Sequence, residues 1–91
     1  MLQSISITVE GLVQGVFYRQ STKAKAIESG ITGEIKNKPD GTVHIVATGT
    51  ETQLEKLIQW CNKGPEMAIV TGVKVEQIPL ISFKGFSIIR N

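Results

Sequence analysis

The sequence has little of the residue types on which many catalytic and structural sites depend. It has one cysteine, Cys61, and one histidine, His44, among 91 residues. A lone cysteine excludes an internal disulfide and a cysteine-based zinc cluster, and it fits a reducing cytosol. With one histidine, Ser-His or Cys-His nucleophilic chemistry would depend on His44 alone. The composition therefore disfavours disulfide scaffolds, zinc-thiolate sites and the common catalytic triads.

Long hydrophobic runs and charge of one sign are also missing. The longest apolar runs fall far short of the ~20 residues that span a bilayer. Residues 1–4 have neither the basic nor the apolar region of a secretory signal. Ten Lys and Arg against eight Asp and Glu give a net charge of +2, and the charges are dispersed. We therefore expect a cytoplasmic protein that uses neither a membrane nor a nucleic acid as partner.

The length allows one modest hydrophobic core. Hydrophobic residues make up 41% and charged residues 20% of the chain, which is ordinary for a globular protein. A chain of this size buries only roughly 60–65% of its unfolded surface. We therefore assign residues 1–91 to one domain and expect a monomer. Separate substrate and cofactor domains are excluded, so the chain does simple chemistry or binds something.

Hydrophobic periodicity predicts alternating strands and helices. Apolar and polar residues alternate over residues 4–10 and 42–48, which is typical of half-buried strands. Lys-Pro-Asp-Gly at 38–41 is a type I turn signature and predicts a hairpin. A helix is expected to open at Thr50 or Glu51 and to end at Gly64. The other expected elements are a helix over 19–29 and strands over 33–38, 69–78 and 86–89.

This order of elements predicts an α+β, ferredoxin-like fold. Strand-helix-strand-strand-helix-strand is the split βαβ arrangement, here with a short C-terminal fifth strand. It forms a two-layer sandwich in which both helices cover one face of an antiparallel sheet. RNA-recognition domains of this topology need aromatic residues on the open face, and that argues against RNA binding here. The open face instead keeps polar residues, namely Ser4, Ser6, Thr8, Thr42 and His44.

The segment between the first strand and the first helix suits an anion. Residues 11–19 read Gly-Leu-Val-Gln-Gly-Val-Phe-Tyr-Arg. Backbone N–H groups are unpaired at a helix start, where the helix dipole adds positive charge. Glycines allow successive N–H groups to turn inward, and Arg19 can present its donors to the same point. The spacing is neither a Walker A loop nor Gly-x-Gly-x-x-Gly, so a nucleotide is not implied. An ordinary turn remains an alternative.

The sequence allows two interpretations of Asn37. Asparagine just before a Pro-Asp-Gly turn commonly serves the turn itself. A neutral amide at the end of a strand can instead orient a water molecule. Both interpretations stay open from spacing alone.

Taken together, these segments resemble the two signatures of the acylphosphatase family. Residues 11–19 match Gly-x-Val-Gln-Gly-Val-x-aromatic-Arg, and residues 33–41 match Gly-x-x-x-Asn followed by Pro-Asp-Gly. The likeness extends over essentially the whole chain. Glu34 departs from it, because the family usually has an aromatic residue there. A Glu34 side chain pointing toward the loop would weaken anion binding.

The resemblance implies hydrolysis of an acyl phosphate to a carboxylate and inorganic phosphate, with no metal and no cofactor. It implies that Arg19 holds the phosphoryl oxygens and that the Asn37 side chain orients the attacking water. It also implies a phosphate-binding loop of backbone N–H groups from Gln14, Gly15, Val16, Phe17, Tyr18 and Arg19. The leaving carboxylate has a conjugate acid of pKa ~4, so it departs without a protein acid. The alternative is a catalytically silent anion-binding or regulatory domain.

Four other residues have ordinary structural interpretations. We expect His44 to be a surface histidine and Cys61 to belong to the core stripe of the second helix. Lys36 and Lys38 flank Asn37 and would raise the local potential if they faced the loop. Solvated strand and turn lysines are the ordinary case.

Overall fold

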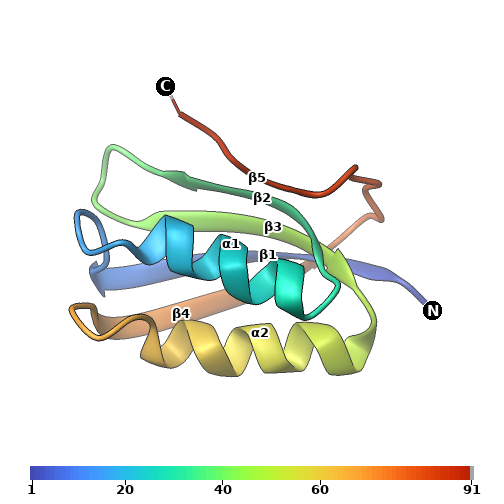
Figure 1. The fold of residues 1–91 in the computed structure, drawn as a ribbon, viewed down its shortest axis with the longest axis horizontal. Coiled ribbons are helices and arrows are strands. Elements are labelled where there is room, and N and C mark those ends of the chain that lie inside the picture. Colours follow the sequence, from blue (N-terminus) through green and yellow to red (C-terminus); the bar gives the residue numbers. More distant parts are fainter. Residues whose placement is uncertain (91) are drawn as a thin grey trace.

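The computed structural model describes residues 1–90, which form two helices and one five-stranded sheet (Figure 1). Asn91, the last residue of the expected domain, lies outside the described residues. In chain order the elements are β1 (Gln3–Leu12), α1 (Tyr18–Glu28), β2 (Thr32–Asn37), β3 (Val43–Gly49), α2 (Glu51–Lys63), β4 (Ile69–Ile78) and β5 (Phe86–Ile88).

The strand order in the sheet is β4-β1-β3-β2-β5. β1 pairs antiparallel with β3 and β4, and β2 pairs antiparallel with β3. Both helices cover one face of the sheet, as Figure 1 shows, and the expected ferredoxin-like α+β fold is confirmed. β5 pairs parallel with β2, so the sheet is mixed. The reason is that the chain crosses from one sheet edge to the other after β4 and then runs in the direction of β2.

The hydrophobic core lies between the sheet and the two helices. Alternate residues of the central strands face it, and small residues let α1 approach closely. On α1 these are Thr22 and Ala26, both fully buried. Burial of each large aliphatic side chain contributes roughly 1.5–3 kcal/mol. The largest buried aliphatic side chains are Ile7, Ile35, Ile45 and Leu57.

The helix boundaries follow local capping chemistry. α1 begins at Tyr18, one residue before the expected start, and Ser29 is its C-cap. α2 has a capping box, in which Gln53 N–H donates to Thr50 Oγ1 at 3.2 Å and Thr50 N–H donates to Gln53 Oε1 at 2.8 Å. Neither helix within residues 1–90 has the length and apolar character needed to cross a bilayer.

One end of the sheet face opposite the helices is covered, so Ser4, one of the polar residues expected on an open face, is not exposed. Ser4 is buried because the connection between β4 and β5 crosses it. Its Oγ accepts a hydrogen bond from Ile81 N–H at 2.9 Å and lies 2.6 Å from Thr48 Oγ1. Thr48 Oγ1 in turn lies 2.7 Å from the Ile81 carbonyl oxygen. The two hydroxyls are therefore satisfied within this connection rather than by solvent.

Candidate active site

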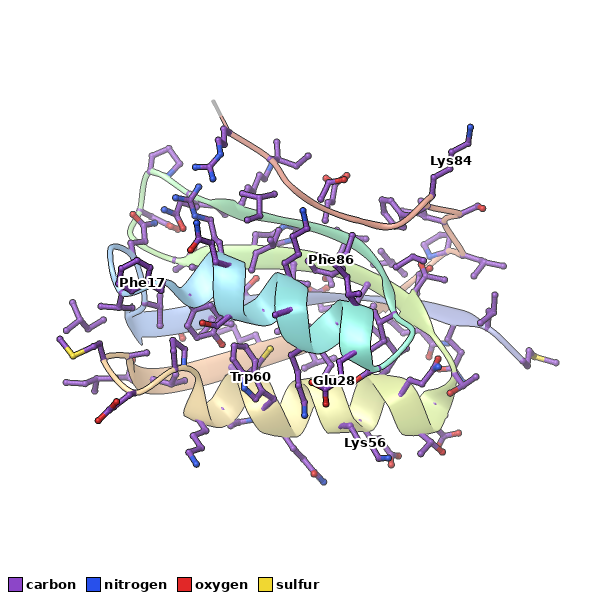
Figure 2. The ribbon with its side chains drawn as sticks, viewed as in Figure 1. Phe17, Glu28, Lys56, Trp60, Lys84 and Phe86 are labelled. Atoms are coloured by element: carbon purple, nitrogen blue, oxygen red, sulfur yellow. The ribbon has the colours of Figure 1, made fainter. Side chains whose placement is uncertain are left out.

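The loop between β1 and α1 is held to the core by buried side chains and also exposes an aromatic side chain to solvent. Val13 and Val16 are buried in the core, whereas Phe17 is exposed (Figure 2). Gly15 and Phe17 have positive φ angles of 75° and 64°. A left-handed conformation at a non-glycine residue costs on the order of 1–3 kcal/mol and is concentrated at functional sites. The strain at Phe17 therefore marks this loop as a candidate site.

The N-terminus of α1 leaves its amides available. Phe17 occupies the N-cap position and makes no side-chain capping bond. The first backbone bond of the helix is donated by Ser21 N–H to Phe17 O at 3.0 Å. The N–H groups of Tyr18, Arg19 and Gln20 therefore have no helical acceptor. No acidic residue stands in the first turn, so the positive end of the helix dipole is not neutralised locally.

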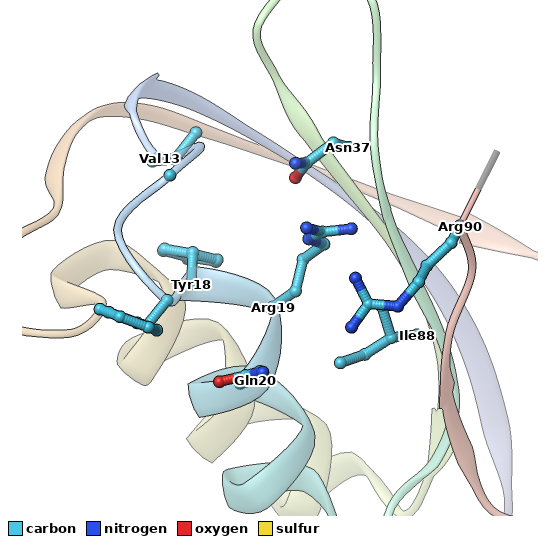
Figure 3. Close-up of a pocket in the computed structure, with 9 residues that line it drawn as sticks. Val13, Tyr18, Arg19, Gln20, Asn37, Ile88 and Arg90 are labelled. Carbon is cyan, nitrogen blue, oxygen red and sulfur yellow. The ribbon is translucent and has the colours of Figure 1, made fainter.

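A pocket of about 240 Å³ opens above this helix start (Figure 3). Figure 3 shows the Asn37 amide and the Arg19 guanidinium pointing into the same space. The loop and α1 contribute Val13, Gly15, Phe17, Tyr18, Arg19 and Gln20, and the sheet side contributes Asn37, Ile88 and Arg90. Of the residues expected at the site, only Gln14 and Val16 do not line the pocket.

Asn37 reaches the pocket from the last position of β2. Ile35 is buried in the core between the sheet and the helices, and strand alternation places Asn37 on the same side. Its Oδ1 is buried and has no hydrogen-bond partner among residues 1–90. A buried acceptor without a partner costs about 1–3 kcal/mol. A water or substrate hydrogen in the pocket would satisfy it.

The Gln14 side chain ties the loop to the turn that follows Asn37. Its Nε2 donates to the Lys38 carbonyl at 2.8 Å and to the Thr42 carbonyl at 2.9 Å. These carbonyls lie at the two ends of the β2–β3 turn. From the sequence, only a backbone role is expected for Gln14, because no local pattern shows that its side chain reaches residues 24 and 28 positions away.

Tyr18 anchors the start of α1 to α2. Its hydroxyl donates to the Cys61 carbonyl at 2.7 Å, and its ring lies 5.5 Å from that of Trp60. Burial raises the pKa of Tyr18 above its ordinary range. The Cys61 side chain is buried in the core, as expected, and burial raises its thiol pKa to about 12. Cys61 is thus no nucleophile at neutral pH.

Among residues 1–90, the pocket is lined by two cations and by no carboxylate. Besides Arg19, the pocket lining includes Arg90, which sequence analysis missed because it follows the recognised motifs. Neither guanidinium has an ion-pair partner among residues 1–90. In that part of the chain, no three His, Cys, Asp or Glu side chains are grouped to hold a metal ion.

The other charged residues near Asn37 face the open side of the sheet. Glu34 pairs with Val46 and Lys36 pairs with His44 in the sheet register, and none of these residues lines the pocket. Glu34 therefore does not oppose an anion there. Partial burial lowers the pKa of His44, and Lys38 and Lys36 lower it further.

Comparisons with known proteins show the family to which the chain belongs. Residues 5–88 match the acylphosphatase family. The chain is 51% identical over 73 residues to an acylphosphatase of Marinobacter nauticus, covering 80% of this chain and 79% of that protein. It is 40% identical over 91 residues to an acylphosphatase of Methylococcus capsulatus, covering 99% of each. The solved structure of an acylphosphatase from Coxiella burnetii superimposes with a TM-score of 0.93 at 38% identity, covering 96% of this chain and 92% of that one.

Proposed function

Because the chain belongs to the acylphosphatase family and is therefore an enzyme that hydrolyses acyl phosphates, we propose that Arg19 and the loop amides hold the phosphoryl group while Asn37 orients the attacking water. The observation that carries this assignment is the convergence of Arg19, Asn37 and the uncapped start of α1 on one pocket.

The phosphoryl group binds between the loop and Arg19. Backbone N–H groups from Gln14 to Arg19 supply neutral donors, and the positive φ angles at Gly15 and Phe17 favour a concave arrangement of amides. The Arg19 guanidinium supplies a planar pair of donors and a full positive charge. These groups are preorganised for the charge on the equatorial oxygens in the transition state.

The water attacks phosphorus in line with the leaving carboxylate. One water hydrogen bonds to Asn37 Oδ1, which directs an oxygen lone pair toward phosphorus. The bond from phosphorus to the water oxygen forms as the bond to the carboxylate oxygen breaks, and the electron pair leaves with the carboxylate. Within the described part of the chain, residues 1–90, no carboxylate or histidine lines the pocket. We therefore assign the water proton to a non-bridging phosphoryl oxygen, so the products are a carboxylate and dihydrogen phosphate.

We further propose that the enzyme needs no metal or cofactor and acts as a cytoplasmic monomer without a nucleic-acid partner. Arg19 and Arg90 supply the positive charge that a divalent cation supplies at many phosphoryl-transfer sites. The lone free thiol is compatible with a reducing compartment. The dispersed charges, with a net value of +2, supply no basic stripe for nucleic acid.

Hydrolysis of benzoyl phosphate in the presence of EDTA tests the proposal. Wild-type protein should turn the substrate over, and Arg19→Ala should lose activity by at least about 10²–10³-fold, because a preorganised charged donor is removed. Lys84→Ala removes an exposed cation outside the pocket and should match wild type. Comparable activity in Arg19→Ala and Lys84→Ala would contradict the role of Arg19, and absence of hydrolysis by wild-type protein would favour the alternative, a silent anion-binding domain.

A further inference from the structure

The parallel pairing of β2 and β5 brings Arg90 to the level of Asn37. Gly33, Glu34 and Ile35 pair with Phe86, Ser87 and Ile88 in order. Ile89 N–H donates to Ile35 O at 2.8 Å, which holds the chain against β2 beyond the last paired residue. Two further steps along this register place residue 90 beside residue 37.

Strand alternation directs Arg90 toward the helices. Phe86 is buried and Ile88 packs against the core, so residue 90 lies on the same side two positions later. Figure 3 shows its guanidinium extending into the space beside Arg19. The position of this cation is therefore set by backbone pairing.

Arg90 lies on the side of Arg19 that faces away from the loop. A second hollow, of about 410 Å³, is lined by Arg19, Asn37, Ile89 and Arg90 and by no loop residue. Arg19, Asn37 and Arg90 line both hollows. The phosphoryl group held by the loop and Arg19 thus leaves Arg90 free for another part of the substrate.

We propose that Arg90 is a specificity-determining residue that binds a second anionic group on the acyl part of the substrate. The substrate class is then acyl phosphates whose acyl chain ends in a carboxylate or a second phosphate. This inference rests on the proposed function, because it needs the phosphoryl group in the loop. No carboxylate of residues 1–90 pairs with Arg90, and Arg90 lines both hollows.

The test compares two substrates that differ in one charge and one methyl group. Adipoyl phosphate has a free carboxylate at the end of a flexible chain, and its monomethyl ester lacks that charge. Wild type should hydrolyse the acid with a kcat/KM about two- to fivefold higher than the ester, mainly through KM, because Arg90 touches no reacting atom. Raising the salt to about 1 M should reduce the preference, because the Debye length falls to about 3 Å.

Arg90→Gln should abolish the preference, Arg90→Lys should keep part of it, and the control Lys84→Gln should keep all of it. Lys84 is an exposed cation that projects into solvent (Figure 2). Equal kcat/KM for acid and ester in wild type, or a preference that survives in Arg90→Gln, would overturn the inference and leave the proposed function standing. An equal loss on both substrates in Arg90→Gln would also overturn it and would assign Arg90 to the phosphoryl group. Hydrolysis of neither substrate by wild type would overturn both proposals.

Discussion

Gln14 Nε2 lies 2.8 Å from the carbonyl oxygen of Lys38 and donates a hydrogen bond to it. Lys38 directly follows Asn37, so one side chain connects the loop between β1 and α1, to which we assign the phosphoryl group, to the strand end that carries Asn37. A misplacement of about 1 Å between such groups can cost on the order of 10²-fold in rate. The distance between the loop and Asn37 therefore depends on the Gln14 side chain.

Gln14→Ala should lower kcat by about ten- to a hundredfold while the inhibition constant of inorganic phosphate changes little. The variant keeps the backbone N–H of residue 14 but removes the side-chain donor to both turn carbonyls, each of which keeps one backbone donor within the turn. Gln14→Glu should behave similarly, because a carboxylate cannot donate. Steady-state kinetics with phosphate as inhibitor measure both quantities. Gln59→Ala, on the exposed side of α2, is the control, and a matching loss of phosphate affinity in Gln14→Ala would contradict this role.

Asn37→Ala should separate turnover from phosphate binding. We expect kcat to fall by roughly 10²–10³-fold, because the water loses its orienting acceptor. The phosphate inhibition constant should stay within about threefold, since the loop and Arg19 are unchanged. Asn62→Ala removes an exposed asparagine on α2 and should have wild-type kinetics. If Asn37→Ala weakened phosphate binding as much as Arg19→Ala does, the proposed division of roles would be wrong.

Tyr18→Phe should destabilise the fold while keeping the aromatic packing. The Cys61 carbonyl is near the end of α2, and Pro65, four residues later, has no N–H to donate to it. The Tyr18 hydroxyl supplies that bond, and its loss should lower the free energy of unfolding by about 1–3 kcal/mol. Urea denaturation measures the change. Unaltered stability of Tyr18→Phe would show that the hydrogen bond makes no net contribution.

Cys61 should resist alkylation in the folded protein at pH 8. Its buried thiol has a pKa raised to about 12 from an ordinary value near 9. The folded state therefore keeps a proton that the unfolded state releases, so the free energy of unfolding should decline as the pH rises from about 9 to about 12. Iodoacetamide labelling with and without urea measures the reactivity.

Cys61→Val is the control for the alkaline decline in stability. In this variant the decline should begin only near pH 10, where Tyr18 ionises in the unfolded chain. Rapid labelling of native wild type, or an identical alkaline decline in Cys61→Val, would contradict the effect of burial at Cys61.

Most of the fold was predictable because local periodicity reports which side of an element is buried. The alternation of Ile5, Ile7 and Val9 identifies β1 and its core face, and the spacing of Leu54, Leu57 and Cys61 identifies the inner face of α2. The boundaries of α1 were less predictable. Its N-cap is Phe17, which sequence alone does not distinguish from an ordinary helical residue.

The sequence by itself determined the order of elements, the core faces and the two motifs that contain Arg19 and Asn37. Each of these is a property of residues close together in the chain. Only the tertiary structure decided that the Gln14 side chain joins the loop to the turn, that Ser4 is covered, and that β5 brings Arg90 into the pocket. These relationships join distant parts of the chain. They depend on where the backbone returns after each crossover, and that path is decided by packing of the whole sheet and both helices.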